Sequence, residues 1–479
     1  MTDASLFVRR GRAGRRILGV ALASAALSSC AVGPDYTPPP APDVTRFTRE
    51  TTASPGNGQS FARGAEVAQQ WWKAYGSKAL DALVEEALAQ SPTLEAADAA
   101  IRAAEASVRA QEGAFFPQVS GTSTSTRSIS SQLATSSASQ TPYNLFTKQL
   151  SVSFTPDIWG ANARAVESLE ARAESARLQL EAARLTLAAN VVTAAVEEAS
   201  LRGQIATTQR LIALQQEHLS LLALQHSLGA ASGLDLSSQQ AALAQTRQTL
   251  PGLEKQLAIQ RDRLTALVGR YPSREIEETF DLSKLTLPKD IPLRLPAQVV
   301  EKRPDIRQAA SDVHGASADV GVAVAARLPD VTLTADTGTS ALKLAQLFTP
   351  GTGFYTLAGT VSQPIFEGMT LLNRQRAAEA RLDEAKARYR ETVIEAFQNV
   401  ADSLRALQAD ARSVRDARLA EAASRRFLDQ TRAQRKYGGV SQLDVLNAQQ
   451  SYLSASMARV RAEAARLSNA AAFFTAIGG

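Results

Sequence analysis

The stretch GAASGLDL at residues 229–236 is repeated in altered form as GGVSQLDV at residues 438–445. An earlier pair of segments also matches, because Pro92 and Pro117 correspond to Pro304 and Pro329. Copies of matching segments are separated by 207 to 212 residues. The chain is therefore predicted to be an internal duplication of two substantial modules. We place the first repeat at 77–270, a linker at 271–294 and the second repeat at 295–479.

Each half contains two segments in which apolar and small polar residues alternate. The predicted strands lie at about 118–128 and 147–155 in the first half, and at about 330–338 and 354–363 in the second. Leu150, Val152 and Phe154, for example, fall on one face, and serines fall on the other. One polar and one apolar face is typical of a strand in a membrane barrel, although a half-buried sheet in water gives a similar pattern.

Each pair of strands is followed by a very long segment with helical periodicity. Apolar residues at steps of three and four predict helices that pack along their length, as in a coiled coil. The two quoted stretches lie at the glycine-containing breaks of these segments. We therefore predict two long helical hairpins, at 160–268 and 369–476, whose turns are the quoted stretches. A single helix from Gly160 to Leu228 would be about 100 Å long.

The turns also carry helix-capping signals. In both stretches a serine precedes an aspartate by three residues, which is the spacing of a capping box. Ser232 and Ser441 are the predicted caps, and Asp235 and Asp444 are the predicted acidic partners. Capping explains these residues without any further function, so a functional role depends on where the turns point.

The amino terminus has the pattern of an export signal. Five arginines precede a short apolar stretch at 17–27, and the sequence LSSC ends at Cys30, the only cysteine of the chain. Residues 1–29 are predicted to be a lipoprotein signal peptide, and Cys30 is predicted to carry the lipid. The alternative is ordinary cleavage that leaves a free thiol, which is a liability in an oxidising compartment.

The composition argues against several classes of protein. Without residues 1–29, which hold five Arg and one Asp, 47 basic and 46 acidic residues remain, so we expect no nucleic-acid binding. The chain has a single cysteine, and His218, His226 and His314 are scattered, so we expect no disulfide and no Cys/His metal site. The sequence lacks the motifs of a nucleophile elbow or a phosphate loop, and we expect no enzyme, no catalytic residue and no cofactor apart from the lipid.

Four strands with an apolar face are too few to close a membrane barrel. Such a barrel must pair all of its strand edges, and the smallest barrels of a single chain have about eight strands. Two copies of this chain would supply eight strands and three copies would supply twelve. If the strands enter a membrane, the protein must be an oligomer.

Segments spread over nearly the whole mature chain resemble the outer-membrane factor family, the TolC-like outer membrane efflux proteins, in its OprM/NodT-type lipoprotein branch. They are CAVGPDYTPP at 30–39, WWKAYGSKALDALVEEAL at 71–88, PDIWG at 156–160, LPAQVVEKRPDIRQA at 295–309, QPIFEG at 363–368, FQNVADSL at 397–404, YGGVSQLDVLNAQQSYL at 437–453 and AAFFTAIGG at 471–479. Each segment alone is weak, and their order and spacing together carry the resemblance.

The resemblance implies a mainly α fold with a membrane β-barrel. Three chains would form a trimeric channel, in which four strands per chain make a twelve-stranded barrel above a periplasmic tunnel of helical hairpins. Segments near 31–76 and 251–300, which are rich in proline and irregular, would contribute to an equatorial belt; the lipidated segment 30–76 belongs to it. The protein would lie in the outer membrane, in contact with its lipid, and extend into the periplasm.

The function implied is that of a passive exit duct for small molecules and drugs in a tripartite efflux pump. Its partners would be two further copies of the chain, a periplasmic adaptor (membrane fusion protein) and an inner-membrane transporter of the RND type. The alternative is a structural lipoprotein that spans the envelope without forming a channel. Such a protein would share the long helices, but it would have no use for alternating strands.

The resemblance also assigns roles to residues in the turns. Residues that would close the duct at its periplasmic end are Leu443, Asp444, Asn447, Gln450 and, in the first hairpin, Asp235. Residues that would contact the adaptor are Gly229, Ala230, Gly438, Gly439 and Val440. Asn447 stands where many family members have a second acid, which puts a double ring of carboxylates in doubt. For Asp444, gating and simple capping remain compatible alternatives.

Overall fold

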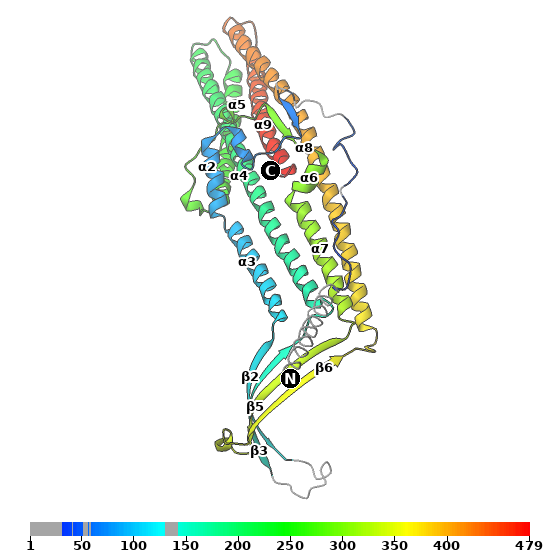
Figure 1. Ribbon diagram of the computed structural model, residues 1–479. Helices are drawn as coiled ribbons and strands as arrows, with labels where there is room; N and C mark the ends of the chain where they lie inside the picture. The colour runs from blue at the N-terminus through cyan, green and yellow to red at the C-terminus, as the bar shows by residue number, and fades with distance from the viewer. Residues whose placement is uncertain (1–30, 41, 51–55, 57–58, 130–141) are drawn as a thin grey trace, which may run out of the picture. The chain divides into compact units, whose positions relative to one another are not determined.

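The computed structural model describes residues 31–40, 42–50, 56, 59–129 and 142–479. The chain divides into two compact units (Figure 1). The first unit comprises the described residues within 1–39, 100–176 and 309–389, and the second comprises those within 40–99, 177–308 and 390–479. The predicted signal peptide and Cys30 lie outside the described residues.

The first unit contains a four-stranded antiparallel sheet in the order β2-β3-β5-β6. Its strands are β2 (Gln118–Ser128), β3 (Tyr143–Phe154), β5 (Asp330–Ala341) and β6 (Gly353–Ser362). β3 begins four residues before the predicted 147, and β5 continues three residues past the predicted 338. Alternation is lost in these extensions, where the adjacent apolar residues Leu145 and Phe146 pair with Thr126 and Ala341, so the strand pattern did not reveal them.

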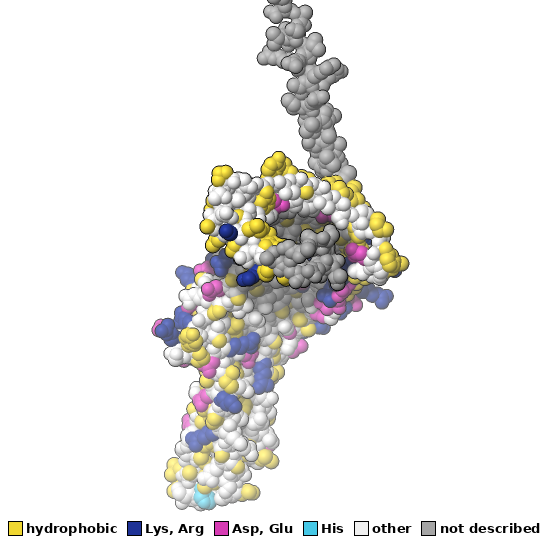
Figure 2. Space-filling view, turned by 90° about the horizontal axis from the view of Figure 1, so that it is seen from below, with side chains coloured by type: hydrophobic (Ala, Val, Ile, Leu, Met, Phe, Trp, Pro, Cys, Tyr) yellow, Lys and Arg dark blue, Asp and Glu magenta, His cyan; other side chains and the backbone are white. Residues whose placement is uncertain are grey.

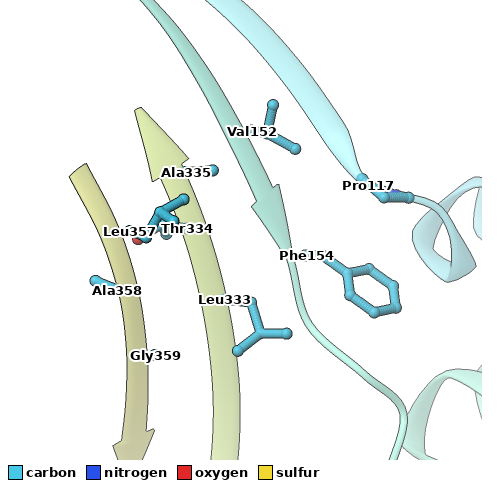
Figure 3. A pocket seen from close by; sticks show the side chains of 9 residues that line it. All are labelled: Pro117, Val152, Phe154, Leu333, Thr334, Ala335, Leu357, Ala358 and Gly359. Atoms are coloured by element: carbon cyan, nitrogen blue, oxygen red, sulfur yellow. The ribbon is translucent and has the colours of Figure 1, made fainter. Parts of the chain in front are cut away.

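The register of the sheet places apolar residues from neighbouring strands on one face. Val152 lies opposite both Val119 and Ala335, and Ala335 lies opposite Leu357. Val152, Phe154 and Leu333 project from the adjacent strands β3 and β5 (Figure 3). Hydrophobic side chains gather along the rim of the curved sheet when it is viewed from the strand side (Figure 2). This face is apolar although much of it is exposed in the single chain.

The opposite face of the sheet is polar. The amide of Gln149 donates to the carboxylate of Asp336 at 2.8 Å and to the Ser151 hydroxyl at 2.9 Å. The hydroxyls of Thr147 and Ser340 lie 3.2 Å apart. The strands therefore have the two-faced character that their sequence alternation predicts.

The helices repeat in length as well as in order. The long helices are α4 (Ala161–Ser227) and α8 (Thr370–Lys436), each of 67 residues. They are followed by α5 (Gly233–Leu267) and α9 (Gln442–Ala476), each of 35 residues. The helices that precede the strands, α3 (Pro92–Glu112) and α7 (Pro304–Ala325), have 21 and 22 residues. This agreement in length is what a duplication of one module produces.

Two predictions overlap in the first repeat, because the hairpin was placed at 160–268 and an irregular segment near 251–300. The structure follows the first of them here, since α5 continues through Pro251 to Leu267. A proline inside a helix costs about 3 kcal/mol. Residues on both sides of it are buried, including Leu243, Thr246 and Leu264. Packing along this face offsets the lost hydrogen bond, and irregular structure begins only after the helix.

The core of the second unit is formed by segments far apart in the sequence. The short helix η1 (Trp71–Tyr75) and helix α2 (Lys78–Gln90) pack on the end of α9. The Trp71 ring stacks on Phe474 with centroids 5.4 Å apart, and the Tyr75 hydroxyl donates to the Leu467 carbonyl at 2.8 Å.

The remaining short elements are divided between the two units. β1 (Ser60–Arg63) pairs in parallel with β4 (Asp290–Leu293). The last short helix, α6 (Pro296–Lys302), leads into α7. Short 3-10 turns occur at 113–115, 272–274, 282–284 and 344–346. Among the residues that the structure covers, we find no helix with the length and apolar character needed to cross a bilayer.

Candidate functional site

The two quoted stretches form the turns of the helical hairpins in the second unit. Gly229 and Gly438 have φ angles of 76° and 73°, a left-handed conformation that favours glycine. The backbone N–H of Ala230 donates to the Gln225 carbonyl at 2.8 Å, and that of Gly439 donates to the Gln434 carbonyl at 3.0 Å. These bonds satisfy carbonyls at the ends of α4 and α8, so each glycine ends its helix by the same backbone mechanism.

The capping box predicted in the second turn is present. The Ser441 hydroxyl accepts from the backbone N–H of Asp444 at 3.2 Å, and the Asp444 carboxylate accepts from the backbone N–H of Ser441 at 2.8 Å. The Ser441 hydroxyl also donates to this carboxylate at 2.6 Å. Hydrogen bonds from the Ser441 hydroxyl and backbone hold the pKa of Asp444 below its ordinary value.

The first turn has only half of the predicted capping box. The Ser232 hydroxyl accepts from the backbone N–H of Asp235 at 3.0 Å, but the Asp235 carboxylate does not return the bond. This carboxylate lies 3.4 Å from the guanidinium of Arg435, near the end of α8. Both side chains are partly buried, with exposed fractions of 30% for Asp235 and 26% for Arg435. The ion pair draws the carboxylate away from the cap and links the two hairpins.

Arg435 also makes a hydrogen bond within its own turn, and a side chain at the matching position of the first repeat makes the same contact. Its guanidinium donates to the Val440 carbonyl at 3.2 Å. At the matching position of the first hairpin, the Nδ1 atom of His226 lies 2.9 Å from the Ala231 carbonyl. The two turns therefore use a side chain at the same place to hold the same carbonyl. Only arginine is long enough to reach the other hairpin as well.

The residues proposed to close the duct lie on one face of α9. Leu443, Asp444, Asn447 and Gln450 are all exposed in the single chain, whereas the intervening Val445 is buried. Their spacing of three and four residues places them in one stripe along the helix. Asp235 and Asp444 have different partners, because the Asp235 carboxylate pairs with Arg435 and the Asp444 carboxylate accepts from Ser441.

The residues proposed to contact the adaptor form the outermost part of the turns. Gly229, Ala230, Gly438 and Gly439 are exposed, and Val440 is half-buried. A Cβ atom added to Gly229 or Gly438 would meet no atom within 4 Å. The surface here is small and open, and the glycines are required by backbone conformation alone.

A chain of buried amides beneath the turns was not predicted from the sequence. The amide of Gln442 donates to Gln239 at 2.9 Å, and the Gln239 amide donates to the Gln215 backbone carbonyl at 3.2 Å. The Gln215 amide in turn donates to Gln449 at 3.3 Å. These side chains are almost fully buried, and they join α4, α5 and α9. His218 continues the chain, because its Nε2 atom lies 2.9 Å from the Gln442 side-chain oxygen.

The signal for this amide chain was present but easily overlooked. The four glutamines occupy positions in the apolar stripes of their helices, where a long polar side chain is unusual. Arg435 was missed for a different reason, because a charged residue at the end of a helix is ordinarily read as exposed. Within the described part of the chain, no group of three or more His, Cys, Asp or Glu side chains could hold a metal ion.

Comparison with known proteins agrees with these observations. The family model of the outer membrane efflux protein matches residues 83–270 and 295–479, which are the two halves of the duplication. The pyoverdine export outer membrane protein OpmQ of Pseudomonas putida is 31% identical over 419 residues, which cover 86% of this chain and 88% of OpmQ.

Two solved structures have the same fold. The outer-membrane channel OprN is 25% identical with a TM-score of 0.85, and the alignment covers 94% of this chain and 99% of OprN. The outer membrane protein VceC of Vibrio cholerae is 27% identical with a TM-score of 0.79, covering 86% of this chain and 99% of VceC. The chain belongs to the outer membrane efflux protein family.

Proposed function

We propose that this outer-membrane efflux channel works as a homotrimer whose chains pool their strands into one twelve-stranded barrel. The observation that carries the proposal is the sheet of the first unit. Within the described residues, β2 and β6 each pair on one side only, although they have 11 and 10 residues. An unpaired strand edge inside a membrane costs several kcal/mol for each unsatisfied group. Copies of the chain would satisfy both edges by joining β6 of one chain to β2 of the next.

The exposed apolar face supports insertion of this barrel in the outer membrane. Val119, Leu357 and Val361 are 64%, 75% and 68% exposed and lie on the apolar face. Side chains of this kind gain free energy when they move from water into lipid, at about 25 cal/mol for each Å² that is buried. The polar face, with Gln149 and Asp336, would then line the interior.

In this proposal the hairpins of three chains form a tunnel that meets a periplasmic adaptor at the turns. An inner-membrane transporter of the RND type supplies the energy, so the chain itself is a passive duct and not an enzyme. Its cargo is small molecules, in keeping with OpmQ, whose name refers to pyoverdine export. The open, small-residue surface of Gly229 and Gly438 is suited to a close approach by the adaptor.

The closed state of the duct would depend on α9. Leu443, Asp444, Asn447 and Gln450 form the exposed stripe on this helix, so threefold symmetry would bring copies of them together. The ion pair between Asp235 and Arg435 would hold the two hairpins of each chain in the closed arrangement. Separately, we propose that Cys30 carries a lipid that anchors the mature amino terminus in the outer membrane.

The test is to purify the mature protein from outer membranes and record single-channel currents in planar bilayers. We expect a trimer that resists SDS until it is heated, and discrete conductance steps. Deletion of the gene should increase susceptibility to at least one toxic small molecule, and the adaptor should co-purify with the wild-type protein. An elongated monomer that gives no conductance would instead support a structural lipoprotein.

A further inference from the structure

The first described residues of the chain, 31–36, lie against α4 and α7 in the first unit. The backbone N–H of Val32 donates to the Trp159 carbonyl at 3.1 Å. The segment also approaches Gly160 closely, because a Cβ atom added to Gly160 would lie only 2.7 Å from the Cα atom of Ala31. Gly160 directly precedes α4 and follows the end of β3 by a few residues. The segment therefore begins at the junction between strand and helix.

A buried arginine binds the middle of the segment. The Arg164 side chain is only 7% exposed. Its guanidinium contacts Asp35 at 2.6 Å and Glu167 at 2.8 Å, and its Nε atom donates to the Val32 carbonyl at 3.3 Å. Two of these three acceptors belong to the segment. If the segment left, Arg164 would keep one carboxylate partner and lose the two contacts that come from outside its own helix.

Two glycines cross at van der Waals distance beside this arginine. A Cβ atom on Gly33 would lie 2.4 Å from the Cα atom of Gly321 in α7. A Cβ atom on Gly321 would lie 2.9 Å from the Val32 carbonyl oxygen. Side chains are excluded at both positions, so the segment and the helix make direct backbone contact. Gly321 has an ordinary helical conformation, so glycine is required there by close neighbours: the Val32 carbonyl of the segment and the Arg164 side chain, whose Cγ atom would lie 2.8 Å from a Cβ.

The far end of the segment is held by an aromatic contact. The Tyr36 ring stacks on His314 with centroids 4.2 Å apart and an angle of 16° between the rings. The Tyr36 hydroxyl donates to the Ala310 carbonyl at 3.4 Å, and the His314 Nε2 atom lies 2.9 Å from Glu167. Glu167 thus contacts both Arg164 and His314, which connects the two ends of the groove.

We propose that the groove formed by Trp159, Gly160, Arg164, His314 and Gly321 is a docking site for the mature amino terminus, residues 31–36. The dock fixes the start of the mature chain at the junction of β3 and α4. It would therefore determine where a lipid on Cys30 enters the membrane relative to the barrel strands. The inference rests on the proposed lipidation only for this last consequence, because the docking contacts involve no lipid.

The dock can be tested by limited digestion of the purified full-length protein with chymotrypsin. Cleavage after Tyr36 requires the segment to leave its groove, whereas cleavage after Tyr437, which is 83% exposed in a hairpin turn, reports general susceptibility. The measured quantity is the ratio of the two cleavage rates. In the wild type we expect cleavage after Tyr36 to be at least about tenfold slower than cleavage after Tyr437, because proteolysis follows the population of the open form.

The matched variants are Gly321→Ala and Gly315→Ala, which lie in the same helix. A methyl group on residue 321 collides with the Val32 carbonyl and with the Arg164 side chain that binds the segment, whereas one on residue 315 meets its nearest atom at an ordinary 3.5 Å. We expect Gly321→Ala to raise the ratio at least about tenfold and Gly315→Ala to leave it unchanged. If Gly321→Ala fails to fold, Asp35→Asn decides, because it weakens the same contact from the segment side.

Two results would overturn the dock: rapid cleavage after Tyr36 in the wild type, or a ratio that neither Gly321→Ala nor Asp35→Asn changes. A Cys30→Ala protein that is exported by a different signal peptide should keep the slow cleavage. Fast cleavage in this protein would show that the lipid holds the segment and would also reject the dock. Mass spectrometry of the mature amino terminus tests the lipid itself, and an unmodified Cys30 would remove the lipid proposal while the dock stands.

Discussion

At the scale of single residues, Arg435 decides how the two turns differ. It holds the Val440 carbonyl of its own turn and lies 3.4 Å from Asp235 of the other hairpin. His226, at the matching place in the first repeat, makes only the local contact. The result is that Asp235 and Asp444, which look equivalent in the sequence, have different partners. One carboxylate connects two hairpins and the other caps its own helix.

The first prediction concerns this ion pair. Replacing Arg435 with Ala, or Asp235 with Asn, should shift the channel toward its open state. Ion pairs with this much exposure contribute roughly 0.2–1 kcal/mol, so the open fraction should increase by no more than about fivefold. Single-channel recording measures this fraction directly.

The control for this prediction is Arg432→Ala. It breaks the more exposed pair between Arg432 and Glu217, whose atoms are 3.8 Å apart, and should change the open fraction less. The Arg435→Ala/Asp235→Asn double variant should open no more than either single variant. Fully additive effects in the double variant would show that the two residues do not act through each other.

The second prediction distinguishes two influences on Asp444: its role in the helix cap, and repulsion from the copies of Asp444 in the other two chains of a trimer. Ser441→Ala should destabilise the first turn of α9 by about 1 kcal/mol, and Ser232→Ala should cost less because its cap has one bond fewer. The pKa of Asp444 is lower in the folded chain than in the unfolded chain. The stability that the Asp444 carboxylate adds is therefore fully present above its unfolded pKa, and it is lost as the pH falls through its lowered folded pKa.

The measurement for this second prediction is amide hydrogen exchange in the first turn of α9 at pH 7 and pH 5. The difference between wild type and Ser441→Ala should be the same at both pH values. A difference that shrinks at pH 5 would mean that three neighbouring copies of Asp444 raise its pKa in the trimer, and crowding would then outweigh the cap.

At the scale of elements, the buried amide chain connects α4, α5 and α9 below the turns. Gln215, Gln239, Gln442 and Gln449 are at most 4% exposed, and each makes a hydrogen bond to another helix. Buried polar networks fix one register of neighbouring helices, because any shift leaves polar groups without partners. Alanine-rich helices slide easily past one another, so the amides supply a specificity that the small apolar residues lack.

The third prediction follows from this network. Gln442→Leu should destabilise the hairpins beneath the turns by about 1–3 kcal/mol, because it leaves the Gln239 side-chain oxygen buried without its donor. The double variant Gln239→Leu/Gln442→Leu should be less destabilised than the sum of the single variants. Hydrogen exchange of α5 and α9 measures both effects. A double variant that is as unstable as the sum would indicate that packing, and not hydrogen bonding, sets the cost.

The sequence predicted the elements well where a pattern is repeated, and less well where tertiary contacts override a local signal. The duplication, the strand alternation and the turns at Gly229 and Gly438 were visible because each has a local cause in the chain. The irregular segment expected near 251–300 begins only after residue 267, because burial of a helix face outweighs the local effect of Pro251. The missing half of the Ser232 cap could not be foreseen, since it depends on Arg435 from a helix 200 residues away.

At the scale of the whole molecule, the sheet favours an oligomer over a solitary chain. Its apolar face is exposed and, in the described residues, its outer strands β2 and β6 are paired on one side only. Both features are unfavourable for a solitary chain in water. When copies close a barrel in lipid, the edges of β2 and β6 become paired and the apolar face is covered by lipid. The matches to OprN and VceC extend over nearly all of those chains, so the comparison concerns the complete channel fold.

The fourth prediction uses two adjacent residues of β6 that lie on opposite faces. Leu357 pairs with Ala335 on the apolar face, and Thr356 pairs with Asp336 on the polar face. An arginine on the lipid face of a barrel costs about 2–4 kcal/mol near the middle of the membrane. We therefore expect Leu357→Arg to reduce the amount of SDS-resistant trimer in the outer membrane and Thr356→Arg to preserve it. The reverse order would place the apolar face inside the barrel.

The equal lengths of the paired helices, 67 residues for α4 and α8 and 35 for α5 and α9, limit how this gene can change. One inserted residue turns the rest of a helix by about 100°. An insertion in α4 alone would rotate its turn away from Arg435. It would also break the hydrogen bonds between Gln215 and the glutamines of α5 and α9. We therefore expect insertions and deletions in these segments to survive only in compensating sets, while substitutions at exposed positions are tolerated. The lengths of these helices are therefore more tightly constrained than their exposed residues.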